Sequence, residues 1–339
     1  MTTFATPTSF GALQPRDREF FDRELNAFIP PRVFDAHCHL WLEDEVQFRL
    51  PGFSGDVDAK EYMRLIDDLH PGRTQGALFL SFATPTNPEG QHRMNEFVGR
   101  ETASNSIFRG EFFVRPEDDP EWVRQEVRRL KLHGLKCYHT FSQTKPTWEA
   151  DIPDFLPERL VKVADEEGWV ITLHMVKSRA VADPSNIHWI RHYCERYPNM
   201  KLILAHSARS FQPAHNLEGL SQLTGLDNLY FDTSANCEPI AHQAIIRIIG
   251  HKKLMYGSDL PISHMRGRSL SAADSFLWIY GDTPVWGEKH QQVHPVLIGL
   301  EHLRSVKWAC WSERLSDAAV EDIFWNNAAG LLGVSSPKP

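Results

Sequence analysis

The stretch Val33-Phe34-Asp35-Ala36-His37-Cys38-His39 decides which fold the rest of the sequence must fit. It is typical of an apolar strand that ends in two histidines one residue apart. Because strand side chains alternate between faces, Asp35, His37 and His39 are expected to point the same way. At the mouth of a barrel, two such imidazoles would converge and could hold a metal ion. A chain with 17 histidines contains about one His-x-His pair by chance, so this pair needs support from other residues.

A repeating pattern begins at Arg32, where short β-branched runs alternate with amphipathic stretches. This alternation is typical of βα units and a parallel sheet. The pattern predicts eight strands, at residues 33–39, 76–82, 110–115, 134–139, 169–174, 201–206, 228–233 and 253–259. It predicts helices at residues 58–70, 120–133, 157–167, 184–197, 243–251 and 316–332. Eight such units close most economically into a (β/α)8 TIM barrel, and a doubly wound open sheet is the alternative.

Two segments lie outside this repeat. Residues 1–30 form a polar N-terminal arm with helical spacing over residues 15–28, which we expect to pack against the body or a partner subunit. Residues 31–339 then form a single barrel domain. Within it, residues 263–310 break the βα period and are rich in Trp, Pro and His. Because aromatic side chains need burial, we expect this insertion to lie over the C-terminal face of the barrel as a lid or a subunit interface.

Composition narrows the choice of partner and compartment. The chain has 339 residues, of which 42% are hydrophobic and 24% charged, as in ordinary soluble globular proteins. A net charge of −8 argues against nucleic acid as the main partner, because no basic excess is available to neutralise phosphates. Five scattered cysteines without a Cys-x-x-Cys pair indicate reduced thiols in the cytoplasm. The sequence shows neither a signal-peptide pattern nor an 18-residue apolar run, so we expect no membrane partner.

Residues that can bind metal end three more of the predicted strands. They are His174, His206 and Asp259. The carboxyl ends of barrel strands surround one pocket, so these side chains should meet His37 and His39 there. The alternation predicts inward-facing neighbours directly below them, namely Thr172 below His174, Leu204 below His206 and Gly257 below Asp259.

The predicted residue set defines a chemistry. Imidazoles and a carboxylate suit Zn²⁺, with Fe²⁺ or Mn²⁺ as alternatives. Ligation by His37, His39, His174 and Asp259 would leave one position open for water, whose pKa a bound divalent ion lowers toward ~7. We expect Asp259 both to bind the metal and to take the proton of that water. His206 would polarise a substrate oxygen or shuttle a proton.

Together these motifs resemble those of the amidohydrolase superfamily, in the branch that contains lactonases, other hydrolases and non-oxidative decarboxylases. The resemblance covers residues 33–332 and implies a (β/α)8 barrel in which His37, His39, His174 and Asp259 hold a metal. It also implies that His206 assists catalysis or binds a second metal. The segments that carry it are Phe34-Asp35-Ala36-His37-Cys38-His39, Thr172-Leu173-His174, Leu204-Ala205-His206, Tyr256-Gly257-Ser258-Asp259-Leu260-Pro261 and Ile323-Phe324-Trp325-Asn326-Asn327-Ala328.

The fourth predicted strand leaves two alternatives open, because Lys136 and His139 fall on opposite faces of it. If Lys136 faces inward, it is either a carbamylated bridge between two metals, as in binuclear relatives, or the partner of a carboxylate inside the barrel. If His139 faces inward, it is a further ligand, a proton donor or a substrate-binding residue.

Several cations follow the predicted strands near the mouth. Because guanidinium groups bind carboxylates in a fork, they favour a small, carboxylated substrate. Solvated loop charges and ion pairs are the alternative for each one. The candidates are Arg49, Lys177, Arg209 and Arg266.

The leading functional hypothesis is a metal-dependent hydrolase that uses a metal-activated water on an ester, lactone or amide bond of a small molecule. The alternatives are a non-oxidative decarboxylase on the same scaffold, an oxygenase with two redox-active metals, and a structural metal-bearing subunit of a hetero-oligomer. Homo- or hetero-oligomers are expected in each case.

Overall fold

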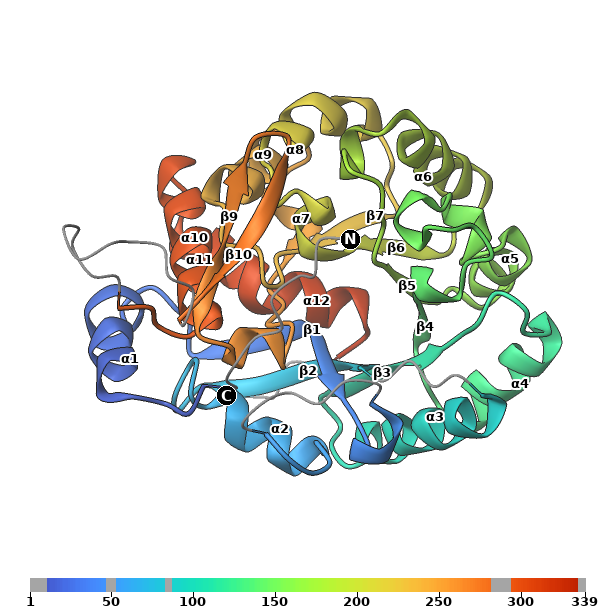
Figure 1. The fold of residues 1–339 in the computed structure, drawn as a ribbon, viewed down its shortest axis with the longest axis horizontal. Helices are drawn as coiled ribbons and strands as arrows, with labels where there is room; N and C mark the ends of the chain where they lie inside the picture. The colour runs from blue at the N-terminus through green and yellow to red at the C-terminus, as the bar shows by residue number, and fades with distance from the viewer. Residues whose placement is uncertain (1–10, 47–52, 83–86, 282–293, 335–339) are drawn as a thin grey trace.

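The computed structural model describes residues 11–46, 53–82, 87–281 and 294–334. Eight parallel strands follow one another around a barrel in sequence order (Figure 1). The backbone N–H groups of Ala36 and Asp259 donate to the carbonyls of Tyr256 and His37 at 2.8 and 2.7 Å, which joins the last strand to the first. The structure therefore confirms the predicted barrel over the open sheet. The strands are β1 (Arg32–Leu40), β2 (Thr74–Ser81), β3 (Phe108–Phe113), β4 (Gly134–Cys137), β5 (Val170–Leu173), β6 (Lys201–Leu204), β7 (Leu229–Asp232) and β8 (Leu254–Met255).

Helices surround the strands, and several begin with an acidic or amide cap followed by proline. Asp119 and Asp183 each accept two backbone N–H groups at the start of a helix, and Asn87 accepts one. Such caps satisfy N–H groups that have no partner within the helix. The outer helices are α2 (Ala59–Ile66), α3 (Pro88–Thr102), α4 (Pro120–Arg129), α5 (Glu158–Glu167), α6 (Pro184–Arg196), α8 (Ala214–Gly219), α9 (Pro239–Ile248) and α10 (Ile298–Ser312).

The amino-terminal end of the barrel is closed by the last helical run of the chain. The predicted helix at 316–332 consists of α11 (Asp317–Glu321), a π-helix η10 (Asp322–Asn326) and α12 (Asn327–Leu331). From this run the fully buried Trp325 packs edge-on against Phe34, with ring centroids 5.9 Å apart. Phe34 belongs to an interior layer that also contains Ile203 of β6 and Met255 of β8.

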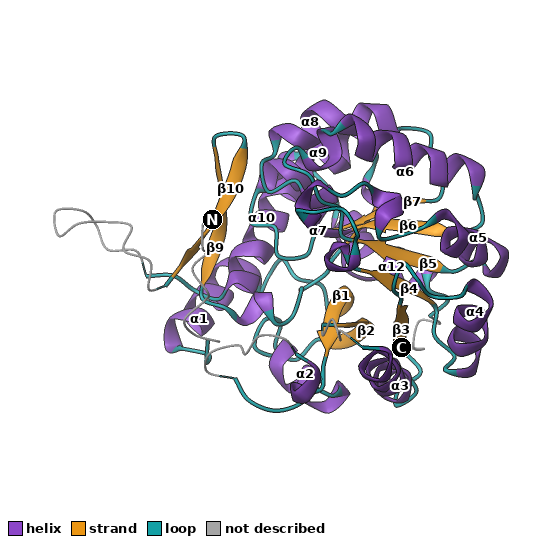
Figure 2. Ribbon diagram, turned by 45° about the vertical axis from the view of Figure 1, so that its right-hand side comes forward, coloured by secondary structure: helices purple, strands orange, loops and turns teal. Residues whose placement is uncertain are grey.

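The segment after β8 divides into a hairpin and a barrel helix. Strands β9 (Gly267–Ala272) and β10 (Ser275–Tyr280) form an antiparallel two-stranded ribbon beside α10 (Figure 2). By contrast, α10 packs against α9 with most of its residues buried, so it belongs to the helical layer. The insertion predicted at 263–310 therefore extends into a helix of the barrel.

The N-terminal arm is fastened to the segment after β8. It contains α1 (Pro15–Phe20) and the π-helix η1 (Phe21–Leu25). The buried carboxylate of Asp17 accepts two hydrogen bonds from Arg266, both at 2.8 Å. The described part of this arm, from residue 11 onward, packs against the body of the protein.

Two further features concern the predicted compartment. All five cysteines are buried free thiols. Among the helices within the described ranges, none combines the length and the apolar composition needed to cross a lipid bilayer.

Candidate active site and metal centre

A bulge in β1 sets the direction of its histidines. The register with β2 shifts between Asp35 and Cys38, so the strict alternation is interrupted there. Ala36 faces the barrel interior, and His37 directly after it also faces the site. Asp35 instead accepts a hydrogen bond from Tyr62 of the surrounding helix α2 at 3.0 Å. The expectation that Asp35 shares the face of His37 and His39 is therefore wrong, because the bulge changes the parity of the strand.

The two β1 histidines converge on one carboxylate oxygen. The Nε2 atoms of His37 and His39 lie 3.7 and 3.2 Å from Oδ1 of Asp259. Their Nδ1 atoms, on the side of each ring away from Asp259, are hydrogen-bonded: His37 to Asp232 at 2.8 Å and His39 to the carbonyl of Ser81 at 3.2 Å. A carbonyl oxygen only accepts hydrogen bonds, so His39 donates from Nδ1 and its Nε2 keeps a lone pair directed at the site.

His206 reaches this centre through an unusual turn. The prediction for His206 assumed that Leu204 faces inward. In the structure Ile203 is the interior residue of β6. Strand alternation alone would therefore direct the side chain of His206 away from the site. Residues 206–209 have φ angles of 59°, 52°, 58° and 53° and form a left-handed turn. This conformation costs a residue other than glycine roughly 1–2 kcal/mol. It brings His206 Nδ1 to 3.8 Å from Oδ2 of Asp259.

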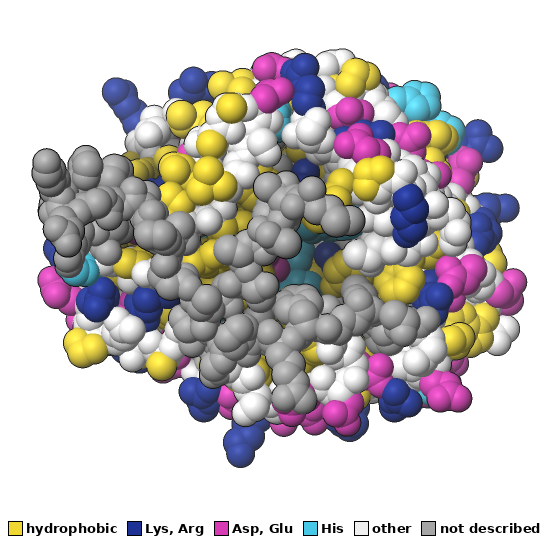
Figure 3. All heavy atoms as spheres, viewed as in Figure 1, with side chains coloured by type: hydrophobic (Ala, Val, Ile, Leu, Met, Phe, Trp, Pro, Cys, Tyr) yellow, Lys and Arg dark blue, Asp and Glu magenta, His cyan; other side chains and the backbone are white. Residues whose placement is uncertain are grey.

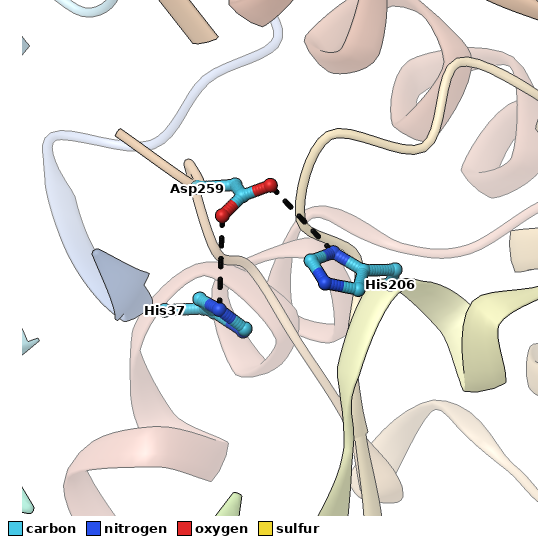
Figure 4. Close-up of side chains that lie close together, drawn as sticks. All are labelled: His37, His206 and Asp259. Carbon is cyan, nitrogen blue, oxygen red and sulfur yellow. Dashed lines mark ion pairs between the residues drawn. The ribbon is translucent and has the colours of Figure 1, made fainter. Parts of the chain in front are cut away.

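His37, His206 and Asp259 therefore surround one point (Figure 4). Their potential ligand atoms all lie within 4.8 Å of one another, and all three side chains are buried. Gly257 permits this approach, because a Cβ atom at that position would lie 2.7 Å from Cβ of His37.

His174 joins the site through His206. Its Nδ1 atom lies 3.0 Å from Nε2 of His206, while its buried Nε2 atom has no hydrogen-bond partner among the residues that the structure describes. Burial, together with the charges of His206 and Arg209, lowers the pKa of His174 well below its usual value. The imidazole is therefore neutral, which is the form that binds metals.

Asp232 is a site residue that the sequence prediction missed. It ends β7 and accepts hydrogen bonds from Nδ1 of His37 and, at 3.0 Å, from the backbone N–H of His206. Burial would raise its pKa, but the adjacent His37 outweighs this effect and the pKa of Asp232 lies below its usual value. An anionic Asp232 fixes the orientation and tautomer of His37. Its position at the end of the seventh predicted strand was the available signal.

Lys136 and His139 both lie in the site region, although strand alternation predicted that only one of them would face inward. Lys136 lies inside the barrel, where burial lowers its pKa and the charge of Glu111 opposes that effect. Its ammonium group lies 5.2 Å from the ring of Tyr138, and Glu111 is the described carboxylate that acts on it most strongly. Strand β4 ends at Cys137, so the ring of His139 is free to turn to 6.0 Å from that of His174.

The predicted cations have different surroundings. Arg209 lies at the mouth, with its guanidinium carbon 5.2 Å from the ring of Trp148 and 5.9 Å from that of Phe276 of the hairpin. Its Nη1 donates to the carbonyl of Lys177 at 3.0 Å, and no carboxylate pairs with it in the part of the chain that the structure describes. Burial lowers the pKa of Arg209 to about 10, so it remains charged at neutral pH.

The other cations are occupied or lie elsewhere. Lys177 pairs with Asp151 at 3.1 Å and donates to the carbonyl of Glu149. The guanidinium of Arg266 is bound to the arm through Asp17 and is not available to a substrate. Arg49 lies outside the described residues.

The residues fit a divalent metal ion. Two ligands that are each ~2.0–2.1 Å from a tetrahedral zinc lie roughly 3.3 Å apart, close to the separations of the two β1 histidines from Asp259. The Nε2 atom of His174, which has no hydrogen-bond partner among the described residues, offers a further neutral nitrogen. Histidine side chains line the bottom of a hollow on this face of the molecule (Figure 3). The fold and site thus define a (β/α)8 barrel with a histidine–carboxylate centre at the carboxyl ends of its strands.

Comparison with known proteins agrees with this class. Residues 34–334 match the amidohydrolase family, and the chain belongs to it. It is therefore an enzyme. No curated protein matches the chain by sequence.

Solved structures share the fold at low sequence identity. An amidohydrolase from Burkholderia multivorans has a TM-score of 0.60 at 13% identity and covers 90% of this chain and 100% of its own. The 5-carboxyvanillate decarboxylase from Sphingomonas paucimobilis has a TM-score of 0.56 at 14% identity, with 90% and 100% covered. A probable 2-pyrone-4,6-dicarboxylic acid hydrolase from Acinetobacter baumannii has a TM-score of 0.55 at 13% identity, with 89% and 99% covered.

Proposed function

We propose that this enzyme is a metal-dependent hydrolase that cleaves an ester, lactone or amide bond in a small carboxylated substrate. The observation that carries the proposal is the convergence of His37, His39 and His206 on the carboxylate of Asp259. We propose Zn²⁺ as the metal, with Fe²⁺ or Mn²⁺ as alternatives. A Burkholderia multivorans amidohydrolase of the same fold contains bound zinc.

His37, His39, His174 and Asp259 would hold the ion, and His206, with Lys136, would be available to a second one. A bound divalent ion supplies Lewis acidity, which activates water and polarises a carbonyl. Asp259 accepts the proton of the attacking water. His206 lies beside Asp259 and His174, so it can pass that proton to the leaving group.

Arg209 would bind the substrate carboxylate at the mouth. A half-buried guanidinium that pairs with no described carboxylate is costly to keep, and an incoming carboxylate would supply that partner. The aromatic rings of Trp148 and Phe276 hold the guanidinium in place while Nε and Nη2 remain available. His139, near His174, would contact the same substrate.

The second candidate is a non-oxidative decarboxylase. The hydrogen-bonded His174–His206 pair favours it, because such a pair can deliver a proton to the carbon that loses CO₂. One solved structure of the same fold is a decarboxylase. Family membership favours an enzyme over a structural subunit. No described residue specifically favours the dinuclear oxygenase. A cytoplasmic location and oligomer formation stay predictions.

Metal analysis of protein purified without added metal tests the proposal. We expect about one equivalent per chain, lost in His37→Ala and retained in His188→Ala, whose histidine is exposed on α6. Two equivalents would assign Lys136 and His206 as ligands of a second ion. A metal content below about 0.3 per chain, unchanged in His37→Ala, would refute the proposal.

Turnover of lactones, esters, amides and aromatic acids in ¹⁸O-labelled water separates the two reactions. A hydrolysis product incorporates the label from water. Decarboxylation releases CO₂ and leaves the product without it.

A further inference from the structure

We propose that Asn236 and His242 are positioning residues that hold the left-handed turn of residues 206–209. Through this turn they place His206 at the metal site and Arg209 at the mouth. The inference rests on the proposed function, because it concerns the same site.

The turn needs support from outside itself. Four successive residues other than glycine have φ angles between 52° and 59°, a region that L-amino acids visit as single residues rather than in runs. His206, Ser207 and Ala208 are buried, so they are not held by solvent. Such a conformation persists only where the surrounding structure determines it.

Asn236 binds the turn at both ends. From its position after β7, its Nδ2 group donates to the carbonyl of His206 at 3.2 Å and to that of Ser210 at 3.0 Å. Asn216 donates to the intervening carbonyl of Ser207 at 3.1 Å. Both asparagine side chains are fully buried. Two buried amides thus satisfy carbonyls that a left-handed turn would otherwise leave without partners.

His242 fixes the side chain in the middle of the turn. Its Nε2 atom lies 3.0 Å from the carbonyl of Asn236, which only accepts, so His242 donates from Nε2. Its Nδ1 atom then accepts, and the hydroxyl of Ser207 donates to it at 2.7 Å. Burial lowers the pKa of His242 to about 4, consistent with this neutral tautomer. One histidine therefore connects the segment after β7 to the turn.

The turn joins the two halves of the site. His206 at its beginning lies beside the carboxylate of Asp259, and Arg209 at its end lies near the rings of Trp148 and Phe276. Among the described residues, the hydrogen bonds of Asn236 and His242 reach neither a ring nitrogen of a proposed metal ligand nor the guanidinium of Arg209. We expect a loss of the anchors to disturb both ends of the turn without removing a ligand.

The test compares two buried asparagines at opposite ends of β7. Asn236→Ala removes the anchor of the turn. The control Asn228→Ala removes an amide that donates to the carbonyls of Cys194, Tyr197 and Met200 at the start of the strand. Both variants should lower the melting temperature. In Co²⁺ titrations of the folded proteins, we expect Asn236→Ala to lose about 10- to 100-fold in affinity and to change the visible spectrum, while Asn228→Ala keeps the parent values.

A second measurement requires no metal and uses a milder variant. Ser207→Ala removes only the hydroxyl that donates to His242, so the carbonyl anchors remain. In metal-free protein, the imidazole ¹⁵N signals of His206 should shift in Ser207→Ala and in Asn236→Ala but not in Asn228→Ala.

The outcomes separate the two proposals. If the parent protein binds no Co²⁺, the proposed function is wrong, and the ¹⁵N signals alone decide the role of the anchors. If the parent binds Co²⁺ but Asn236→Ala matches it in affinity and in the His206 signals, the positioning role is refuted. Equal losses in Asn228→Ala would also refute it, because the effect would then be one of general stability.

Discussion

Asp232 offers the sharpest prediction for a single residue. The substitution Asp232→Asn keeps the shape of the side chain but replaces the anion that accepts from Nδ1 of His37. We expect Zn²⁺ affinity to fall by about 10- to 100-fold, as is typical when the partner of a metal-binding histidine is lost. Competition with a chelator measures this. The exposed Asp274→Asn variant serves as the control and should bind like the parent.

Arg209 gives a prediction about the substrate. In Arg209→Met, the KM for a carboxylated substrate should rise roughly ten- to a hundredfold, because a hydrogen bond to a charged group contributes about 1.5–3 kcal/mol. Metal content should stay unchanged. The control Arg179→Met removes a rim arginine that already pairs with Glu218. An unchanged KM in Arg209→Met would show that another group binds the carboxylate.

Single residues also show where sequence reasoning succeeds. His37, His39 and Asp259 were predicted together because strand ends in a barrel share one rim, and the structure brings them together. The directions of Asp35 and His206 could not be predicted. A bulge and a left-handed turn set them, and both depend on contacts with distant segments.

Among the elements, the C-terminal helical run has a purely structural role. Trp325 fills the amino-terminal end of the barrel, and its Nε1 has no hydrogen-bond partner among the described residues. Trp325→Ala should therefore reduce the free energy of unfolding by about 3–5 kcal/mol. Trp325→Phe should cost much less, because no hydrogen bond is lost. Urea denaturation measures both, and a loss of metal affinity in folded Trp325→Phe would contradict the assignment.

Elements were predictable where their pattern is strong. All eight strands were anticipated, because buried parallel strands form short β-branched runs. Helix α3 was missed, since Gly90 and Gly99 weaken its helical pattern. Most of helix α10 was assigned to the insertion because aromatic residues such as Trp308 were expected to need burial, although Trp308 is exposed.

At the scale of the whole molecule, buried histidines make stability depend on pH. Burial lowers the pKa of His264 to about 4 and that of His70 to about 3, from 6.5. These two histidines therefore become protonated below about pH 6.5 in the unfolded chain, but only near pH 4 or below in the folded protein. Above pH 6.5 we expect these histidines to leave the free energy of unfolding unchanged. As the pH falls below 6.5, that free energy should decrease by about 1.4 kcal/mol per pH unit for each such histidine.

Urea denaturation of the metal-free protein at pH 7.5, 6 and 5 tests this dependence. In His264→Gln, the free energy of unfolding should fall less steeply with decreasing pH, because one fewer proton is taken up on unfolding. A slope equal to that of the parent would mean that His264 is protonated in the folded state.

The bond between the first and last strands has a consequence for biosynthesis. His37 is made long before its partner Asp259, which lies more than 200 positions further along the chain. Further residues must then be added before Asp259 leaves the exit tunnel of the ribosome, each advancing an extended chain by at most ~3.3–3.6 Å. The newly made chain thus exposes His37 and His39 long before Asp259, whose carboxylate completes their site, has been synthesised. An ion at the proposed site can accordingly gain its full set of protein ligands only after Asp259 has emerged.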